Sequence, residues 1–161
     1  MKKIILTLLT FLIFSIGYAQ QLSTYTESFD SGNIPTSWAS FDNGVGAEQI
    51  WHTTNNAANV YSPEYSAEIN RENIGAGNTS EDWLVSDLQT IPAKSQFRFY
   101  ARSSLDGDRG TVYQIRVSEA SQTNPNDFTI IQSYTSIELS RFSTVYEEKV
   151  IDLNPYNGKN I

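Results

Sequence analysis

The stretch Glu81-Asp82-Trp83-Leu84-Val85-Ser86-Asp87-Leu88 places two carboxylates directly before a large aromatic and two aliphatic side chains. The apolar middle of the stretch requires a hydrophobic core to pack against. The two acids require water, a cation or backbone donors, because burying an isolated carboxylate is very costly. We therefore expect a core strand here, with Glu81 and Asp82 at its outer end.

From Gln20 onward, the chain favours strands over helices. No window carries apolar residues at helical spacing, and short apolar runs alternate with turns rich in Ser, Thr, Asn and Gly. Two segments, 96–102 and 113–118, alternate cleanly between apolar and polar residues. The pattern predicts an all-β fold, a two-sheet antiparallel β-sandwich. The side chains that we expect in its core are Trp38, Trp83, Phe97, Phe99, Ile115 and Val117.

Further strands are predicted at residues 22–30, 128–134 and 146–153, where apolar or aromatic residues lie between turn residues. The run Leu105-Asp106-Gly107-Asp108-Arg109-Gly110 separates the two alternating segments. Because Asp-Gly is a strong turn signal, we expect this run to be the loop of a β-hairpin.

The N-terminus has the three parts of a secretory signal peptide. A basic Met1-Lys2-Lys3 start precedes an apolar run over residues 4–14, and small residues follow at Gly17 and Ala19. We predict that residues 1–19 are a cleaved signal peptide and that residues 20–161 form the mature domain. A membrane anchor is the alternative, but the run is shorter than the roughly 20 apolar residues that span a bilayer.

Charge and residue usage exclude several classes of function. Without residues 1–19, which contain Lys2 and Lys3, nine Lys and Arg oppose eighteen Asp and Glu, a formal charge of −9. An acidic surface repels phosphates, so nucleic acid and anionic membranes are not expected partners. The chain has no Cys and a single His, which excludes disulfides, Cys–His catalysis, Cys-based zinc sites and multi-histidine metal centres.

Four motifs in a fixed order resemble one family. They are Glu27-Ser28-Phe29-Asp30-x-Gly32-x-Ile34-Pro35-x-x-Trp38, Glu81-Asp82-Trp83-Leu84-Val85-Ser86, Tyr113-x-Ile115-Arg116-Val117-Ser118 and Asp152-Leu153-x-x-Tyr156-x-Gly158-Lys159. Together they resemble the cleaved-adhesin domain, also called choice-of-anchor J, a MAM-like jelly roll. That domain occurs in gingipain adhesin regions and in surface proteins of type IX-secreting bacteria. The resemblance covers about residues 25–161.

The resemblance implies a jelly-roll sandwich in a secreted or cell-surface protein that binds ligands rather than catalysing a reaction. Relatives continue past the Gly158-Lys159 turn with further strands and usually further domains. We therefore expect the domain at 20–161 to be incomplete at its C-terminus, with further C-terminal domains in the full-length protein.

Calcium is bound in several relatives, and the resemblance implies a candidate structural calcium site at Glu27, Asp30, Glu81 and Asp82. Hard cations take several carboxylate and carbonyl oxygens, and the family fold brings the first strand near the Trp83 strand. The alternative is that these four are solvated carboxylates at strand ends.

Other polar and aromatic residues have weaker functional readings. Asp106-Gly107-Asp108 lacks the later ligands of an EF-hand, including the bidentate Glu, and a turn is the simpler interpretation. His52 has no nucleophile elbow to serve. Asn78-Thr79-Ser80 matches a glycosylation sequon. A ligand platform of aromatic rings that stack on sugars, with core packing as the alternative for each, is predicted at Trp51, Tyr61, Tyr65 and Tyr100.

The sequence therefore predicts a non-catalytic adhesion module that binds an extracellular protein or glycan. A carbohydrate-binding module accessory to a linked hydrolase or peptidase domain is the second hypothesis. An enzyme in its own right is the third, and a glycosidase that uses only two carboxylates is its one remaining form.

Overall fold

The structure is a computed structural model that describes residues 25–46, 50–61 and 64–161. The predicted signal peptide lies outside the described residues. The described elements, in chain order, are β1 (Ala39–Asp42), β2 (His52–Thr54), β3 (Ser66–Glu68), β4 (Asp82–Val85), β5 (Gln96–Ala101), β6 (Val112–Val117), the 3-10 turn η1 (Pro125–Asp127), β7 (Thr129–Thr135), α1 (Ser136–Leu139), β8 (Glu147–Asp152) and the 3-10 turn η2 (Asn154–Tyr156).

The strands pair in two nested sets, and every pair is antiparallel. In the first half of the chain β1 pairs with β4 and encloses the β2–β3 pair. In the second half β5 pairs with β8 and encloses the β6–β7 pair. Each half is thus one long antiparallel hairpin, with an outer strand pair and an inner strand pair. A long hairpin of this kind can bend so that its two strand pairs lie in different parts of a sandwich.

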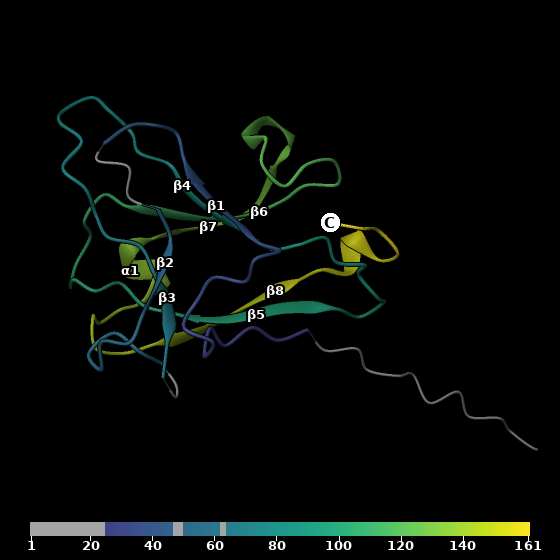
Figure 1. Ribbon diagram of the computed structural model, residues 1–161, viewed down its shortest axis with the longest axis horizontal. Coiled ribbons are helices and arrows are strands. Elements are labelled where there is room, and N and C mark those ends of the chain that lie inside the picture. The colour runs from purple at the N-terminus through teal and green to yellow at the C-terminus, as the bar shows by residue number, and fades with distance from the viewer. Residues whose placement is uncertain (1–24, 47–49, 62–63) are drawn as a thin grey trace, which may run out of the picture.

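Two layers are visible in Figure 1, with β1, β4, β6 and β7 in one and β5 and β8 in the other, while β2 and β3 run steeply across one end. The layers touch where the Phe99 ring of β5 meets the Tyr134 ring of β7 edge-on, with centroids 6.5 Å apart. The Lys149 ammonium of β8 lies 5.5 Å from the same Tyr134 ring. The all-β sandwich that the sequence predicts is confirmed.

Aromatic rings supply much of the packing between elements. Trp83 on β4 stacks on Phe41 of β1 with ring centroids 5.7 Å apart. The Phe128 ring is tilted against the Trp83 ring, with centroids 5.3 Å apart. The Arg116 guanidinium of β6 covers the Trp83 ring at 4.7 Å. The stretch Glu81–Leu88 therefore does join the first half of the chain to the second. The buried aliphatic side chains among the described residues are Ile91, Leu139 and Ile151.

Three expectations about local structure are wrong. Residues 25–30 form no strand, because Phe29 has φ +63° and its N–H is held by the Glu27 carboxylate. The run 105–110 is no hairpin loop, because it joins β5 to β6 and these belong to different pairs. Phe97 is 40% exposed, so it is not a core residue, although it stacks on Phe99.

The end of the described chain pairs with the segment after β4. Gln89 and Ile161 exchange two backbone hydrogen bonds of 2.8 and 3.0 Å, and the Ile91 N–H donates to the Lys159 carbonyl at 2.9 Å. Thr90 and Asn160 form the bridge between them. No helix in the described ranges has the length and hydropathy needed to cross a membrane.

Candidate functional site

Three tyrosines from separate parts of the chain meet at one end of the β5–β8 pair. The Tyr61 and Tyr100 rings stack with centroids 4.4 Å apart and planes 14° from parallel. The Tyr146 ring lies 5.1 Å from Tyr61 and is tilted by 57°. Tyr61 is 49% exposed and Tyr100 is 46% exposed, so the stacked pair faces solvent. We call Tyr61, Tyr100 and Tyr146 the tyrosine cluster.

Each tyrosine is placed by a different element. Tyr100 is near the end of β5, directly opposite Glu148 of β8. Tyr61 lies in the connection between β2 and β3, and its backbone N–H donates to the Ser66 hydroxyl at 3.0 Å. Tyr146 directly precedes β8, and its hydroxyl donates to the Asn59 carbonyl. The cluster therefore joins the β2–β3 connection to the β5–β8 pair.

Arg102 contacts Tyr146 and the residues around the cluster. Its guanidinium lies 5.2 Å from the Tyr146 ring and donates to the Asn59 side-chain oxygen at 2.8 Å. It also donates to the backbone carbonyls of Ala58 and Ser143. A planar guanidinium has five N–H donors in a fixed geometry, so it can satisfy several acceptors while its face lies against an aromatic ring.

The Asn59 side-chain amide connects Arg102 to β3. Its N–H₂ group donates to both oxygens of the Glu68 carboxylate, at 3.1 and 3.2 Å. Hydrogen bonds to ionised acceptors are among the stronger ones in proteins. The connection that carries Tyr61 is thus tied to β3 through Glu68 and to β5 through Arg102.

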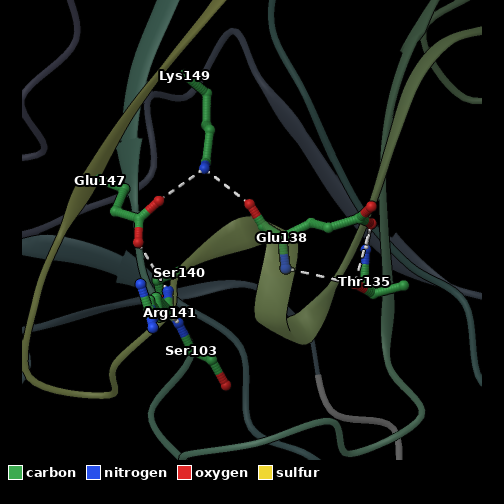
Figure 2. A network of polar contacts seen from close by, with 7 residues as sticks. All are labelled: Ser103, Thr135, Glu138, Ser140, Arg141, Glu147 and Lys149. Atoms are coloured by element: carbon green, nitrogen blue, oxygen red, sulfur yellow. Dashed lines mark hydrogen bonds and ion pairs between the residues drawn. The ribbon is translucent and has the colours of Figure 1, made fainter.

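A second network, shown in Figure 2, fixes the segment that leads into Tyr146. The Lys149 ammonium donates to the Glu138 carbonyl at 2.7 Å and pairs with the Glu147 carboxylate at 3.0 Å. The other oxygen of Glu147 accepts from the Arg141 backbone N–H at 2.7 Å. That backbone bond, followed by the bond to Lys149, lowers the pKa of Glu147.

The same network fixes the short helix α1. Thr135 and Glu138 form a reciprocal capping box in which each side chain accepts from the other's backbone N–H. The Ser140 hydroxyl accepts from the buried Ser103 backbone N–H at 2.7 Å. Residues 138–141 of this segment are therefore held against β8 by Glu147 and Lys149 and against the end of β5 by Ser103 (Figure 2).

Beside Tyr100, the sheet presents polar side chains. Arg98 pairs with Glu148 at 3.0 Å, with both side chains well exposed, and also donates to the Gln96 side-chain oxygen at 3.0 Å. The Tyr61 hydroxyl, followed by the Glu148 carboxylate, raises the pKa of Tyr100. The phenol of Tyr100 is therefore neutral at physiological pH and able to donate a hydrogen bond.

The structure brings together two of the four aromatics predicted as a platform, Tyr61 and Tyr100. Trp51 instead donates its indole N–H to the Asp82 carbonyl at 3.2 Å. The Tyr65 ring packs against Gly32, where a Cβ would lie 3.1 Å from the ring. Tyr146 was not among the predicted residues, because only the β5–β8 register, which sets Glu147 opposite Ala101, carries it to the cluster.

The four predicted calcium ligands belong to two segments of the chain. Glu27 and Asp30 belong to the 25–38 segment. Glu81 directly precedes β4, and Asp82 is the first residue of β4. Among the described residues no hydrogen bond or ion pair joins the two acid pairs, and no group of three or more His, Cys, Asp or Glu gathers to hold a metal. One carboxylate oxygen of Asp30 and one of Asp82 are nevertheless buried without a hydrogen-bond partner.

Asp82 has the most perturbed environment of the four. Burial, followed by the carboxylates of Glu72 and Asp42, raises its pKa. Glu72 packs onto Gly46, where an added Cβ would collide with the carboxylate. Asp42 and Glu72 are therefore acids near Asp82 that the sequence did not single out.

The remaining candidates have local structural roles. The Asp106 carboxylate accepts from the Ser143 N–H at 2.7 Å, and the Asp108 carboxylate accepts from the Gly110 N–H at 2.9 Å. His52 contacts the Ile50 carbonyl at 3.2 Å. The Asn78 amide donates to the Ile74 carbonyl at 2.8 Å, which closes its own loop.

Comparison with known families gives one match, to the family model described as Cleaved Adhesin Domain, over residues 22–159. No curated protein and no solved structure matches the chain. The matched range contains the tyrosine cluster and all four predicted acids.

Proposed function

This chain belongs to the cleaved-adhesin family, and from that membership we propose that it is a secreted or cell-surface module that mediates adhesion without catalysis. Its ligand is an extracellular protein or glycan. The stacked pair of Tyr61 and Tyr100 is the observation that carries the proposal. Large aromatic rings held half-exposed are typical of binding surfaces, since they offer much apolar area at little cost in conformational entropy.

The two networks around the cluster support a binding role over simple packing. A site binds tightly when its side chains are fixed before the ligand arrives, because less freedom is lost on binding. Arg102 fixes Tyr146 and the Tyr61 connection, and Lys149 fixes the segment that leads into Tyr146. A single His and the absence of Cys support the non-catalytic part of the proposal.

A carbohydrate-binding module accessory to a linked hydrolase or peptidase domain is the second candidate. The same stacked tyrosines favour it, because exposed flat rings suit sugar rings. The two candidates differ in their targets: an adhesin retains cells or extracellular proteins, and an accessory module increases the rate of a linked enzyme on a polymeric substrate.

We further propose a structural calcium ion that uses the buried, unpartnered oxygens of Asp30 or Asp82. Such oxygens fit a hard cation, which takes carboxylate and carbonyl ligands. Glu27 is partly committed to the Phe29 N–H, so backbone carbonyls and water would complete the coordination.

Binding of the purified full chain to defined extracellular targets tests the adhesive function. The chain is immobilised and exposed to neutral glycans, sialylated glycans, collagen, fibronectin and laminin in biolayer interferometry. We expect saturable binding to at least one target, and loss of that binding in a Tyr61→Ala/Tyr100→Ala double variant.

The control is Phe142→Ala, which removes an aromatic ring of similar exposure outside the tyrosine cluster. This variant should bind like the wild type. Absence of binding to every target, or equal binding by the double variant, would overturn the proposal that this surface is the adhesive site.

A further inference from the structure

We propose that Tyr100, with Gln96, Arg98 and Glu148 beside it, forms a subsite for one pyranose ring of a neutral glycan. The inference rests on the proposed adhesive function and narrows its ligand from protein or glycan to an uncharged carbohydrate. It is carried by the half-exposed Tyr100 ring, the polar groups next to that ring, and the charge around them.

Tyr61 covers one face of the Tyr100 ring, and Tyr100 is nevertheless 46% exposed. The two rings stack at 4.4 Å, and Tyr61 in turn contacts Tyr146. Among the described residues, no other ring and no cationic group lies over Tyr100. Tyr61 is therefore the middle ring of the cluster, and Tyr100 is its outer ring, with nearly half of its surface open to a ligand.

A pyranose ring complements such an exposed ring. One side of the sugar presents C–H groups, which are attracted to the negative face of an aromatic ring, and its rim carries hydroxyls. The stack with Tyr61 holds Tyr100 in place without a ligand, so little rotamer freedom is lost on binding.

The neighbours of Tyr100 on the sheet supply hydrogen bonds for the sugar hydroxyls. Residues two apart on a strand share a face, roughly 7 Å apart, so Arg98 is the adjacent side chain and Gln96 is the next. Glu148 lies opposite Tyr100 in the register. This row thus offers the planar donor groups of Gln96 and Arg98 and the acceptor of Glu148 beside the exposed Tyr100 ring.

The Arg98–Glu148 pair does not close this row to a ligand. Both side chains are exposed, by 56% and 38%, so solvent screens their attraction. Exposed ion pairs contribute little to stability, and these two groups can therefore turn to sugar hydroxyls at small cost.

Charge favours a neutral sugar over an anionic one. The chain carries a formal net charge of −7, and Glu148 and Asp152 share the face of Tyr100. Sialic acids and uronates would be repelled, as would the phosphates of a nucleotide whose base stacks on the ring. The one cation beside Tyr100 on this face, Arg98, is already neutralised by Glu148.

The composition of the face favours a sugar over a protein. By register its members are Gln96, Arg98, Tyr100, Glu148, Val150 and Asp152, so Val150 is the only aliphatic side chain. Stable protein interfaces bury about 800 Å² per partner around an apolar centre, and this face adds only one valine to the two half-exposed tyrosine rings.

Titration of the full chain with defined oligosaccharides tests the inference. The neutral probes are gluco-, manno-, galacto- and xylo-configured tetrasaccharides, and the anionic probes are a sialylated glycan and a uronate oligomer. Isothermal titration calorimetry gives the Kd, and saturation-transfer NMR identifies the sugar protons that contact the protein.

We expect at least one neutral tetrasaccharide to bind, with saturation transfer strongest at the C–H protons of one ring face. Tyr100→Ala should weaken binding by roughly tenfold, the scale of one aromatic stacking contact. Tyr100→Phe keeps the ring and should retain most of the affinity. Phe142→Ala should leave the Kd unchanged, and circular dichroism verifies that each variant is folded.

Four outcomes separate the inference from the proposed function. Binding of collagen, fibronectin or laminin without any neutral sugar would overturn the inference and leave the adhesive function standing. Tighter binding of the anionic probes, or full affinity in Tyr100→Ala, would also overturn the inference. Absence of binding to every sugar and protein tested would overturn both.

Discussion

Asp42 lies directly opposite Asp82 in the β1–β4 pair, so two carboxylates face each other across the strands that carry Phe41 and Trp83. The Asp42 carboxylate has a partner, the Gly44 N–H at 2.7 Å, but one oxygen of Asp82 is buried without any. Like charges directly opposite in a sheet are destabilising. Burial, then Glu72, then Asp42 raise the pKa of Asp82, so ionised Asp82 opposes folding.

The first prediction concerns the pH dependence of this cost. Because the pKa of Asp82 is higher in the folded state than its ordinary 3.8, the folded state binds its proton first. Relative to Asp82→Asn, the wild type should be less stable at pH 7 in the presence of chelator. The difference should shrink as the pH falls through the raised pKa and be gone below 3.8. Urea unfolding across this pH range measures it.

The control for this experiment is Glu64→Gln, which removes a negative charge from an exposed position. This substitution should leave the pH profile unchanged. A wild type that is more stable than Asp82→Asn at pH 7 in chelator would contradict the assigned electrostatics of Asp82.

The second prediction concerns Trp83 as the joint between the halves of the chain. Trp83→Ala removes the stack with Phe41, the contact with Phe128 and the surface that Arg116 covers. We expect the free energy of unfolding to fall by about 3 kcal/mol, near the lower end for large aromatic truncations, because Trp83 is only half-buried. Ile130→Ala, at an exposed position, should cost much less. Equal losses in urea denaturation would rule out Trp83 as the joint.

The third prediction concerns the Lys149 network. Lys149→Met keeps the apolar stem but removes the hydrogen bond to the Glu138 carbonyl and the pairing with Glu147. The Lys149 side chain is only 13% exposed, so water cannot fully replace these bonds, and we expect a loss of about 1–2 kcal/mol. Hydrogen exchange of residues 136–146 should accelerate, because this segment loses its anchor.

Lys159→Met is the matched control for Lys149→Met. It removes the ion pair with Glu119 at 2.6 Å, in which both side chains are about half-exposed. Pairs of this kind contribute roughly 0–1 kcal/mol, so stability and the exchange of residues 136–146 should change little. The network would lose its assigned role if the two substitutions had the same effect.

Strand positions were largely predictable from the sequence, and strand partners were not. The alternation around Phe99 and Ile115 identifies β5 and β6, because period-two patterning is a local property. The Asp-Gly signal between them coincides with a bend in the chain but cannot specify which strand lies alongside. Here β5 pairs with β8, about fifty residues away, and β6 pairs with β7. The failure at Phe29 has another cause: the Glu27 carboxylate captures its backbone N–H and competes with a strand ladder.

The candidate site was predictable only in part, for the same reason. The sequence shows which residues are aromatic but not where each ring packs. It therefore predicted Tyr61 and Tyr100 together with Trp51 and Tyr65, which have other partners. Tyr146 carries no local signal, since its place follows from the long-range β5–β8 register. Arg102 likewise reads as an ordinary strand-end cation until the fold places Asn59 and Ser143 around it.

The last prediction is that calcium stabilises the folded chain. With a net charge of −7, the acids of the chain repel one another, and the chain has no disulfide to add stability. Asp30 and Asp82 each have one buried carboxylate oxygen without a hydrogen-bond partner. An ion that binds only the folded state stabilises it by RT ln(1 + [L]/Kd), about 2.7 kcal/mol at a hundredfold excess over the Kd. The melting temperature in calcium should therefore exceed that in chelator.

Single substitutions locate the calcium ion, because the two acid pairs are separate in the chain and no hydrogen bond or ion pair joins them among the described residues. If the ion lies at β4, Asp82→Asn removes the calcium-dependent rise in melting temperature and Asp30→Asn keeps it. The opposite pattern places the ion at the 25–38 segment, and loss in both variants means that the acids converge around one ion. If Asp82 is a ligand of the ion, Asp82→Asn should be stabilising in chelator and destabilising in calcium. The carboxylate repels its neighbours when the ion is absent and coordinates the ion when it is present. A wild type that melts at the same temperature in calcium and in chelator would leave Glu27, Asp30, Glu81 and Asp82 as ordinary acids.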